Sequence, residues 1–591
     1  MHAPAQTSWF GSRAGKAWFG IRANGLRALR LIEDIAAPAG RRPASLAYRP
    51  AAGDDEGRVL AESVSPLWTS LFDDRSALVA GKVQNLRVAA TKLDGLHFAA
   101  GDVFSFWKAV GRPTERRGYV EGRELREGCM ISSIGGGLCQ LSNALYSAAL
   151  DAGMRIVERH PHSQVVPGSL AERGRDATVF WNYLDLRFRC ERAFAIEARL
   201  TQDRLIVRFR GDAAPRREAS SRPALRAALV GDPAPAPDDC GDCAQGECVQ
   251  RFEPAPRSRS TGYLLDEMWP EFDRWIAGRL RSGDFASVPM DGVRRKRPNY
   301  AWNSVRNEGV RLVEHRWLAL RRSLASRRLQ AQGAARQRRL LAFDREFARA
   351  FAKAVPYDAE QLVVPVGMLA ELVRTGVLGG RRYAVLMTRA PIAMLQRDLD
   401  RAAALHPESP TLADFRADEA LVRLEETGLG NADSIVTPHT AVADYAGRYG
   451  VPVERLEWVF PEFAGKASQG KSLLFPASAL GRKGAYEVRE ACAELGLEVR
   501  VLGSASEGEG FWRGTKARAA APGDIFADVG CVVLPAYVEH RPGLLLKALA
   551  AGIPVICSPE CGLPAQLPAT TVVPAGDARR LVEALKAMDL A

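Results

Sequence analysis

The sequence lacks the apolar segments that would place a chain inside a membrane. No run of about 18 apolar residues occurs in its 591 residues, which argues against a transmembrane helix. The first residues also lack the apolar core of an export signal. The ten cysteines are scattered, which favours a reducing compartment over a disulfide scaffold. These absences predict a cytoplasmic protein, with a peripheral position on the inner face of the membrane as an extension of that prediction.

Acidic residues are fewer than basic ones, which gives a net charge of +12 and predicts an anionic partner. Residues 16–32 combine apolar side chains such as Trp18 and Ile21 with basic ones such as Lys16 and Arg22. This pattern is typical of a basic amphipathic helix, which fits an anionic membrane surface and equally fits docking on its own domain. Docking is the preferred interpretation, and the membrane surface stays open.

The chain is too long for a single hydrophobic core, so several domains are expected. We predict an α/β multidomain protein. Its expected parts are a basic N-terminal extension (1–59), a mixed α/β domain (60–212), a Pro- and Ala-rich linker (213–261), a basic helical connector (262–340), and two Rossmann-like halves of a doubly wound parallel-sheet module (341–465 and 466–591).

Three consecutive glycines, Gly135 to Gly137, precede a stretch whose apolar period predicts a helix over 138–151. Cys139 would lie in its first turn, where unpaired N–H groups and the helix dipole favour a thiolate. The glycines would let a substrate carbonyl approach backbone donors, as an oxyanion hole requires. A nucleophilic cysteine is one interpretation, and a buried structural cysteine is the other. The candidate oxyanion loop comprises Gly136, Gly137 and Gln140.

Two histidines, His160 and His162, follow the predicted helix. A returning strand can bring either imidazole back to Cys139, as a cysteine–histidine pair of the papain type requires. His162 is preferred because the residues after it could anchor its loop. Asp185 and Asp176 are both candidates for the group that orients the imidazole.

Residues from about 60 to 212 resemble the VanW family, named from vancomycin-resistance clusters. The matching segments begin at Gly81, Gly101, Gly118, Gly135, Glu158 and Ala177. Some VanW domains are described as L,D-transpeptidases that form cell-wall cross-links through this cysteine. The resemblance therefore implies that Cys139 is the nucleophile, that His162 or His160 is the general base, and that a peptidoglycan peptide or envelope precursor is the substrate. A substrate outside the membrane conflicts with the cytoplasmic location expected above.

The predicted linker contains three closely spaced cysteines, Cys240, Cys243 and Cys248. The first pair has the spacing of a zinc knuckle, but a fourth ligand is missing nearby. A structural zinc and a polar linker with exposed thiols both remain open.

Residues 262–340 are rich in arginine pairs interleaved with Trp302 and Trp317. Arginines with aromatic residues suit nucleic-acid contacts, but no nucleic-acid-binding motif accompanies them. A solvated or membrane-facing helix is therefore preferred, and a nucleic-acid partner is not expected.

The last 250 or so residues alternate short apolar runs with amphipathic ones, which predicts parallel strands separated by helices. Ligands of such sheets bind beyond the carboxyl ends of the strands. Residues 481–484, Gly503 and the segment 534–556 resemble the retaining, nucleotide-sugar-using GT-B glycosyltransferases.

That resemblance implies that Lys483 neutralises the donor pyrophosphate and that Glu539 is the first of two glutamates holding the sugar and the ribose. The second glutamate position is occupied by Lys547, which cannot accept hydrogen bonds from a ribose diol. The family's arginine before Lys483 is also missing, and Arg482 could replace it. The candidate nucleotide-sugar residues are Lys483, Arg482, Gly503, Glu539 and Gly543.

Three functional classes are consistent with the sequence. The first is an envelope enzyme that joins cysteine acyl transfer to a glycosyltransferase-like module. The second is a glycosyltransferase whose VanW domain only recognises an envelope precursor. The third is a non-catalytic assembly protein. The first is preferred on its chemistry, with no cofactor expected beyond a nucleotide-sugar donor and the zinc considered above.

Overall fold

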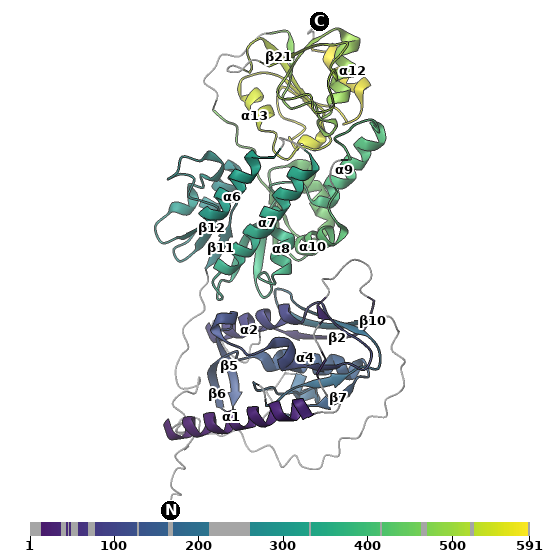
Figure 1. Cartoon of the computed structure of the whole chain (residues 1–591). Coiled ribbons are helices and arrows are strands. Elements are labelled where there is room, and N and C mark those ends of the chain that lie inside the picture. Colours follow the sequence, from purple (N-terminus) through teal and green to yellow (C-terminus); the bar gives the residue numbers. More distant parts are fainter. Residues whose placement is uncertain are drawn as a thin grey trace, which may run out of the picture. The chain divides into compact units, whose positions relative to one another are not determined.

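The protein, seen in a computed structural model, consists of two compact units (Figure 1). One comprises Met1–Arg259, Pro356–Glu360 and Arg374–Arg381, and the other comprises the rest of the chain. The structure describes residues 13–36, 43–44, 47–48, 57–68, 77–126, 129–162, 170–181, 183–211, 260–329, 333–413, 416–462, 470–520 and 525–588. No helix within these ranges is long and apolar enough to cross a membrane.

The first unit is built from antiparallel strands and a few helices. A five-stranded sheet has the order β1-β3-β9-β10-β2, and β4-β8-β7 and β5-β6 form smaller sheets. Helices α2 and α4 pack on the large sheet and on each other. The elements are α1 (Arg13–Ala36), β1 (Ala47–Tyr48), β2 (Arg58–Pro66), α2 (Ala77–Leu93), β3 (Leu96–Phe98), β4 (Val103–Ser105), α3 (Phe106–Val110), β5 (Glu121–Arg126), β6 (Cys129–Ile134), α4 (Leu138–Asp151), β7 (Arg155–Glu158), β8 (Arg187–Arg189), β9 (Phe194–Leu200) and β10 (Arg204–Gly211).

Stacked phenylalanines fill the core of this unit. The rings of Phe104 and Phe188 stack at 4.5 Å, and those of Phe98 and Phe194 stack at 4.9 Å. Along β2, buried and exposed side chains alternate, as expected for a strand with one face on the core. The core therefore ties the large sheet to the small β4-β8-β7 sheet.

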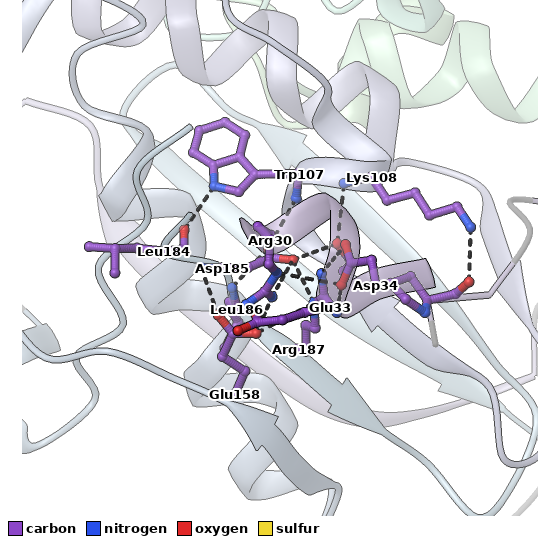
Figure 2. A network of polar contacts seen from close by, with 12 residues as sticks. Arg30, Glu33, Asp34, Trp107, Lys108, Glu158, Leu184, Asp185, Leu186 and Arg187 are labelled. Atoms are coloured by element: carbon purple, nitrogen blue, oxygen red, sulfur yellow. Dashed lines mark hydrogen bonds and ion pairs between the residues drawn. The ribbon is translucent and has the colours of Figure 1, made fainter. Parts of the chain in front are cut away.

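A buried network of charges attaches α1 to the body of the first unit (Figure 2). Arg187 donates two hydrogen bonds to Asp34 of α1, at 2.7 and 2.9 Å, and a third to Asp185 at 2.9 Å. Arg30 of α1 forms an ion pair with Glu158 of β7. The structure thus supports the docking interpretation of the N-terminal helix, and the contacts that dock it are ionic.

The second unit contains two parallel sheets. The first has the order β13-β12-β11-β14-β15-β16-β17 and the second β20-β19-β18-β21-β22-β23. In each sheet the first strand along the chain lies inside, between the second strand and the fourth, as in doubly wound Rossmann folds. The α/β fold class expected from the sequence is confirmed.

The first parallel sheet is formed by residues 261–455. Its strands are β11 (Thr261–Leu264), β12 (Phe285–Val288), β13 (Arg311–Glu314), β14 (Gln361–Pro365), β15 (Arg382–Leu386), β16 (Ser434–Thr437) and β17 (Val453–Arg455). Its helices are α5 (Pro270–Ala277), α6 (Arg316–Arg327), α7 (Ala334–Ala354), α8 (Val366–Arg374), α9 (Ile392–Leu405), α10 (Glu419–Gly430) and α11 (Thr440–Ala446).

The second parallel sheet is formed by residues 472–572. Its strands are β18 (Ser472–Phe475), β19 (Glu498–Val501), β20 (Lys516–Ala519), β21 (Val529–Leu534), β22 (Val555–Cys557) and β23 (Thr570–Val572). The accompanying helices are α12 (Ala485–Leu495), α13 (Gly543–Ala550) and α14 (Ala578–Lys586).

The predicted basic helical connector at 262–340 is wrong. This segment contributes β11, β12 and β13, so the first Rossmann-like half begins near residue 260 and not at 341. Each of these strands has only four residues and stands among arginine-rich loops and helices. The basic composition of the loops therefore concealed three short strands, of which β11 and β12 are mostly buried.

Candidate functional site

The glycine-rich turn before α4 is held by close packing and by one buried amide. Gly137 caps the helix with φ of 96°, and a Cβ atom there would lie 2.2 Å from the Lys82 side chain. Asn85 of α2 donates to the carbonyls of Gly136 (2.9 Å) and Val120 (3.0 Å) and accepts from the Val120 N–H. The turn is therefore fixed, and Cys139 lies in the first turn of α4, as the sequence predicts.

A second segment is held against α4 by two polar side chains of that helix. Asn143 accepts a hydrogen bond from the Ala177 N–H at 2.7 Å, and Ser142 donates to the Ala177 carbonyl. Thr178 next to it forms an antiparallel bridge with His160, after the end of β7. Two residues further along each side of that bridge, His162 and Asp176 face each other.

His162 lies between Asp176 and Cys139. The Nδ1 atom of His162 bonds to an Asp176 carboxyl oxygen, and the His162 backbone N–H donates to the other oxygen at 2.5 Å. The Cys139 thiol is close enough to His162 to raise the pKa of the imidazole. Because Nδ1 is occupied by the carboxylate, Nε2 is the ring atom left for the thiol.

The contacts of His162 favour its charged form. Burial alone would lower the pKa of His162, but its hydrogen bond to Asp176 and the neighbouring Cys139 thiol outweigh burial and raise the pKa to about 10. Burial acts to raise the pKa of Asp176, yet the bonds from His162 lower it. An imidazolium between a carboxylate and a thiol is the arrangement that a thiolate nucleophile needs.

The prediction of Asp185 as the orienting carboxylate is wrong. Its oxygens accept from Ser105 Oγ (2.6 Å) and Arg187 (2.9 Å), and burial raises its pKa despite these contacts. It belongs to the network that docks α1 (Figure 2), whereas Asp176 pairs with His162.

Two other predicted site residues, His160 and Gln140, follow Cys139 in the sequence, but their side chains bond to residues outside the candidate site. The His160 ring pairs with Glu158 at 3.0 Å, although the backbone of His160 forms the bridge to Thr178. The Gln140 side-chain amide donates to Ser65 Oγ (3.0 Å) and the Pro66 carbonyl (2.7 Å), so it is directed at β2. The Cys139 sulfur itself lies 3.7 Å from Thr178 Oγ1.

The second unit brings Lys483 and Glu539 together. The Lys483 ammonium donates to the Glu539 carboxylate at 2.8 Å and to the Val538 carbonyl at 2.9 Å. These residues follow β18 and β21, the adjacent strands at which the strand order of the second sheet reverses. Burial tends to raise the pKa of Glu539, but the charge and hydrogen bond of Lys483 lower it.

His439 is a member of this cluster that sequence reasoning missed. It follows β16, its Nδ1 accepts from the Val442 N–H at 3.2 Å, and its Nε2 therefore donates to the Glu539 carbonyl at 3.0 Å. Burial lowers the pKa of His439. Its position at the carboxyl end of a predicted strand is the signal that could have found it.

The remaining candidates of the second unit have structural partners. The Arg482 carbonyl accepts from the N–H groups of Tyr537 and Val538 at 3.0 and 3.1 Å. Gly503 has φ of 114° and leaves room for Ser478, and Gly543 begins α13. Lys547 lies one turn into α13, 5.9 Å from the Phe526 ring centroid, where the resemblance requires a glutamate.

The metal hypothesis rests on residues that the structure does not describe. Cys240, Cys243 and Cys248, like most of the predicted linker, lie outside the described ranges. Among the residues that are described, no group of three or more His, Cys, Asp or Glu side chains could hold a metal ion.

Comparison with known proteins identifies the domain that carries Cys139. Residues 81–210 match the family model described as VanW like protein. This segment is a VanW-like domain. The chain is 36% identical to VanW, the vancomycin B-type resistance protein of Enterococcus faecalis, over 113 residues, covering 18% of this chain and 40% of that protein. It is also 36% identical to Bacillus subtilis YoaR over 104 residues, 18% of this chain and 34% of that protein. The chain thus spans less than half the length of these relatives.

Several solved structures that match the chain are glycosyltransferases and related enzymes. The lipopolysaccharide outer core galactosyltransferase WaaB has 12% identity and a TM-score of 0.31, over 56% of this chain and 90% of that one. Sucrose-phosphate synthase of Thermosynechococcus elongatus has 15% identity and a TM-score of 0.37, with the same coverage. Anabaena HepE, solved with UDP-glucose, has 10% identity and a TM-score of 0.34, over 56% and 89%. The second unit contains two parallel sheets, and the resemblance of its sequence to the GT-B glycosyltransferases gives it the name GT-B-like module.

The His162 contacts predict that the stability of the VanW-like domain depends on pH. Because the pKa of His162 rises from 6.5 to about 10 on folding, its contacts stabilise the fold fully below pH 6.5 and lose this effect as the pH rises through 10. We expect the melting temperature of His162→Gln to be lower than that of the native chain. This difference should be largest below pH 6.5 and should disappear above pH 10. Calorimetric scans would measure it, with His160→Gln as the matched control. A gap that does not change with pH would contradict the pairing.

Proposed function

We propose that the VanW-like domain is a cysteine acyltransferase acting on peptides. The observation that carries this proposal is the hydrogen bond from His162 to Asp176 beside Cys139, whose thiol at the N-terminal end of α4 raises the pKa of the imidazole. The carboxylate holds the imidazole in one orientation, and the imidazolium stabilises a thiolate beside it. Backbone N–H groups of the first helical turn would stabilise the oxyanion in this proposal.

The reaction uses these groups in two transfers. The Cys139 sulfur attacks the carbonyl carbon of a peptide bond, and the leaving amine takes a proton from His162 as the C–N bond breaks. A thioester on Cys139 remains. An acceptor amine then attacks the thioester, gives its proton to His162, and releases the sulfur as a thiolate. With water as acceptor, the same steps hydrolyse the peptide.

A peptide of the cell envelope is the substrate that we propose. The family resemblance implies peptidoglycan stem peptides, and the name of one relative connects that relative with vancomycin resistance. Transfer between two such peptides would form a cross-link, which is L,D-transpeptidase chemistry.

Acyl transfer predicts a covalent adduct on Cys139. When the full chain is incubated with a peptidoglycan stem peptide, intact-protein mass spectrometry should show a thioester adduct that a second peptide amine removes. Cys139→Ala should form neither adduct nor product, and His162→Gln should slow adduct formation by about 10²–10⁴-fold.

The control for this experiment is His160→Gln, because His160 pairs with Glu158. Its rate should stay within about twofold of the native rate. Product formation by Cys139→Ala at the native rate would refute the proposal, as would an adduct on another residue.

A second candidate function is supported by the GT-B-like module. We propose that it binds a nucleotide sugar, with the Lys483 ammonium on the pyrophosphate and Glu539 on the sugar. The supporting observation is their ion pair beside the strand-order reversal, where doubly wound sheets bind ligands. Lys547 in place of the second glutamate leaves the ribose without that acceptor, so weak nucleotide binding is expected.

Titration calorimetry with UDP, GDP and ADP tests this candidate. We expect one of them to bind and Lys483→Ala to weaken its affinity at least about tenfold, because the ammonium offsets the pyrophosphate charge. Lys586→Ala, an exposed lysine paired with Glu494 on the same module, should bind as the native chain does. Absence of heat with all three nucleotides would favour a scaffolding role.

A further inference from the structure

Helix α1 is attached through its charged side chains. Arg27 donates to the Trp181 carbonyl at 3.2 Å, Arg30 pairs with Glu158, and Asp34 pairs with Arg187. Residues spaced by three or four positions share a face of a helix. The face of α1 that lies on its own domain is therefore polar.

The opposite side of α1 is apolar and exposed. Ile21, Ile32 and Ile35 are 66%, 62% and 65% exposed, and at about 100° per residue they lie within about 60° of one another. Leu29 and Leu31, 58% and 59% exposed, widen this row on both sides. An ordinary surface helix buries its apolar stripe and exposes its charges, so α1 is inverted with respect to its domain.

Basic residues accompany the exposed row. Among the residues of α1, five are basic and two acidic. Arg22 is exposed beside the row, as is the acidic Glu33. A helix with net positive charge and an exposed apolar row matches a surface that is negative outside and apolar within.

We propose that α1 is a membrane-docking helix that inserts its apolar row into the interface of an anionic lipid bilayer. The row of Ile21, Leu29, Leu31, Ile32 and Ile35 enters the acyl boundary, and the exposed Arg22 beside it contacts the lipid phosphates. The ion pairs of Arg30 and Asp34 keep the VanW-like domain attached to the helix while its apolar side faces the lipid.

A second copy of the chain fits this surface less well. Symmetric dimers bring the same patch of two subunits together, so the basic residues beside the row would face their own copies. A stable protein interface also needs about 20–30 residues from each partner, far more than this single row supplies. An anionic bilayer offers acyl chains for the apolar row and phosphates for the basic side chain beside it.

Vesicle flotation of the full chain tests the proposal. The native chain should bind vesicles that contain phosphatidylglycerol, bind less to vesicles of phosphatidylcholine alone, and dissociate in high salt. The double variant Ile32→Ser/Ile35→Ser should lower the partition coefficient at least about tenfold, because two large apolar side chains no longer leave water. It should keep the native melting temperature, since both side chains are exposed.

Leu405→Ser is the matched control, because Leu405 is 53% exposed and lies on α9 of the other unit. Its vesicle binding should equal that of the native chain. Equal binding by the native chain and the double variant, or binding by neither, would overturn the proposal. An oligomer seen by light scattering that disappears in the double variant would assign the row to a second copy instead.

Discussion

The pairing of His162 with Asp176 is the interaction on which the candidate active site depends. The two residues lie on segments that follow α4 in the sequence and are folded back against it. Ser142 and Asn143 of α4 bind the backbone of Ala177, and the His160–Thr178 bridge then aligns the two segments. The helix that presents the thiol therefore also positions its partners, through side chains in the turn after Cys139. The imidazolium, carboxylate and thiol stabilise one another in a partly buried place where none would be charged at low cost by itself.

A second group of buried charges has a different purpose. Asp185 and Arg187 are almost fully buried, and they bind α1 through Asp34 while Glu158 binds it through Arg30. Glu158 also pairs with His160, so the anchor of α1 and the strand that leads to His162 share a residue. If α1 enters a bilayer, the domain with the thiol is held at the membrane surface, where precursors of the envelope are found.

The sequence was sufficient where one element carried a strong local signal. The glycine turn and apolar period predicted α4 with the bounds that the structure shows, and near-continuous apolar runs predicted β16 and β18. Sequence reasoning failed where partners are chosen by tertiary contacts. Asp176 and Asp185 were equally plausible as residue types, and only the Thr178 bridge distinguishes them. The four-residue strands β11 to β13 were not predicted, because the arginine-rich segments around them indicated a basic helical connector. The inverted orientation of α1 was also beyond reach, because an amphipathic pattern does not show which face meets the domain.

The alkylation rate of Cys139 as a function of pH tests the central claim most directly. With the other reactive cysteines replaced, iodoacetamide should label Cys139 rapidly in the native chain, because the imidazolium of His162 stabilises the thiolate. His162→Gln and Asp176→Asn should lower the labelling rate at least about tenfold below pH 10, where His162 is charged, whereas His160→Gln should match the native profile. A thiol that is inert at every pH, or a profile unchanged by His162→Gln, would contradict a catalytic cysteine and leave the VanW-like domain as a recognition module.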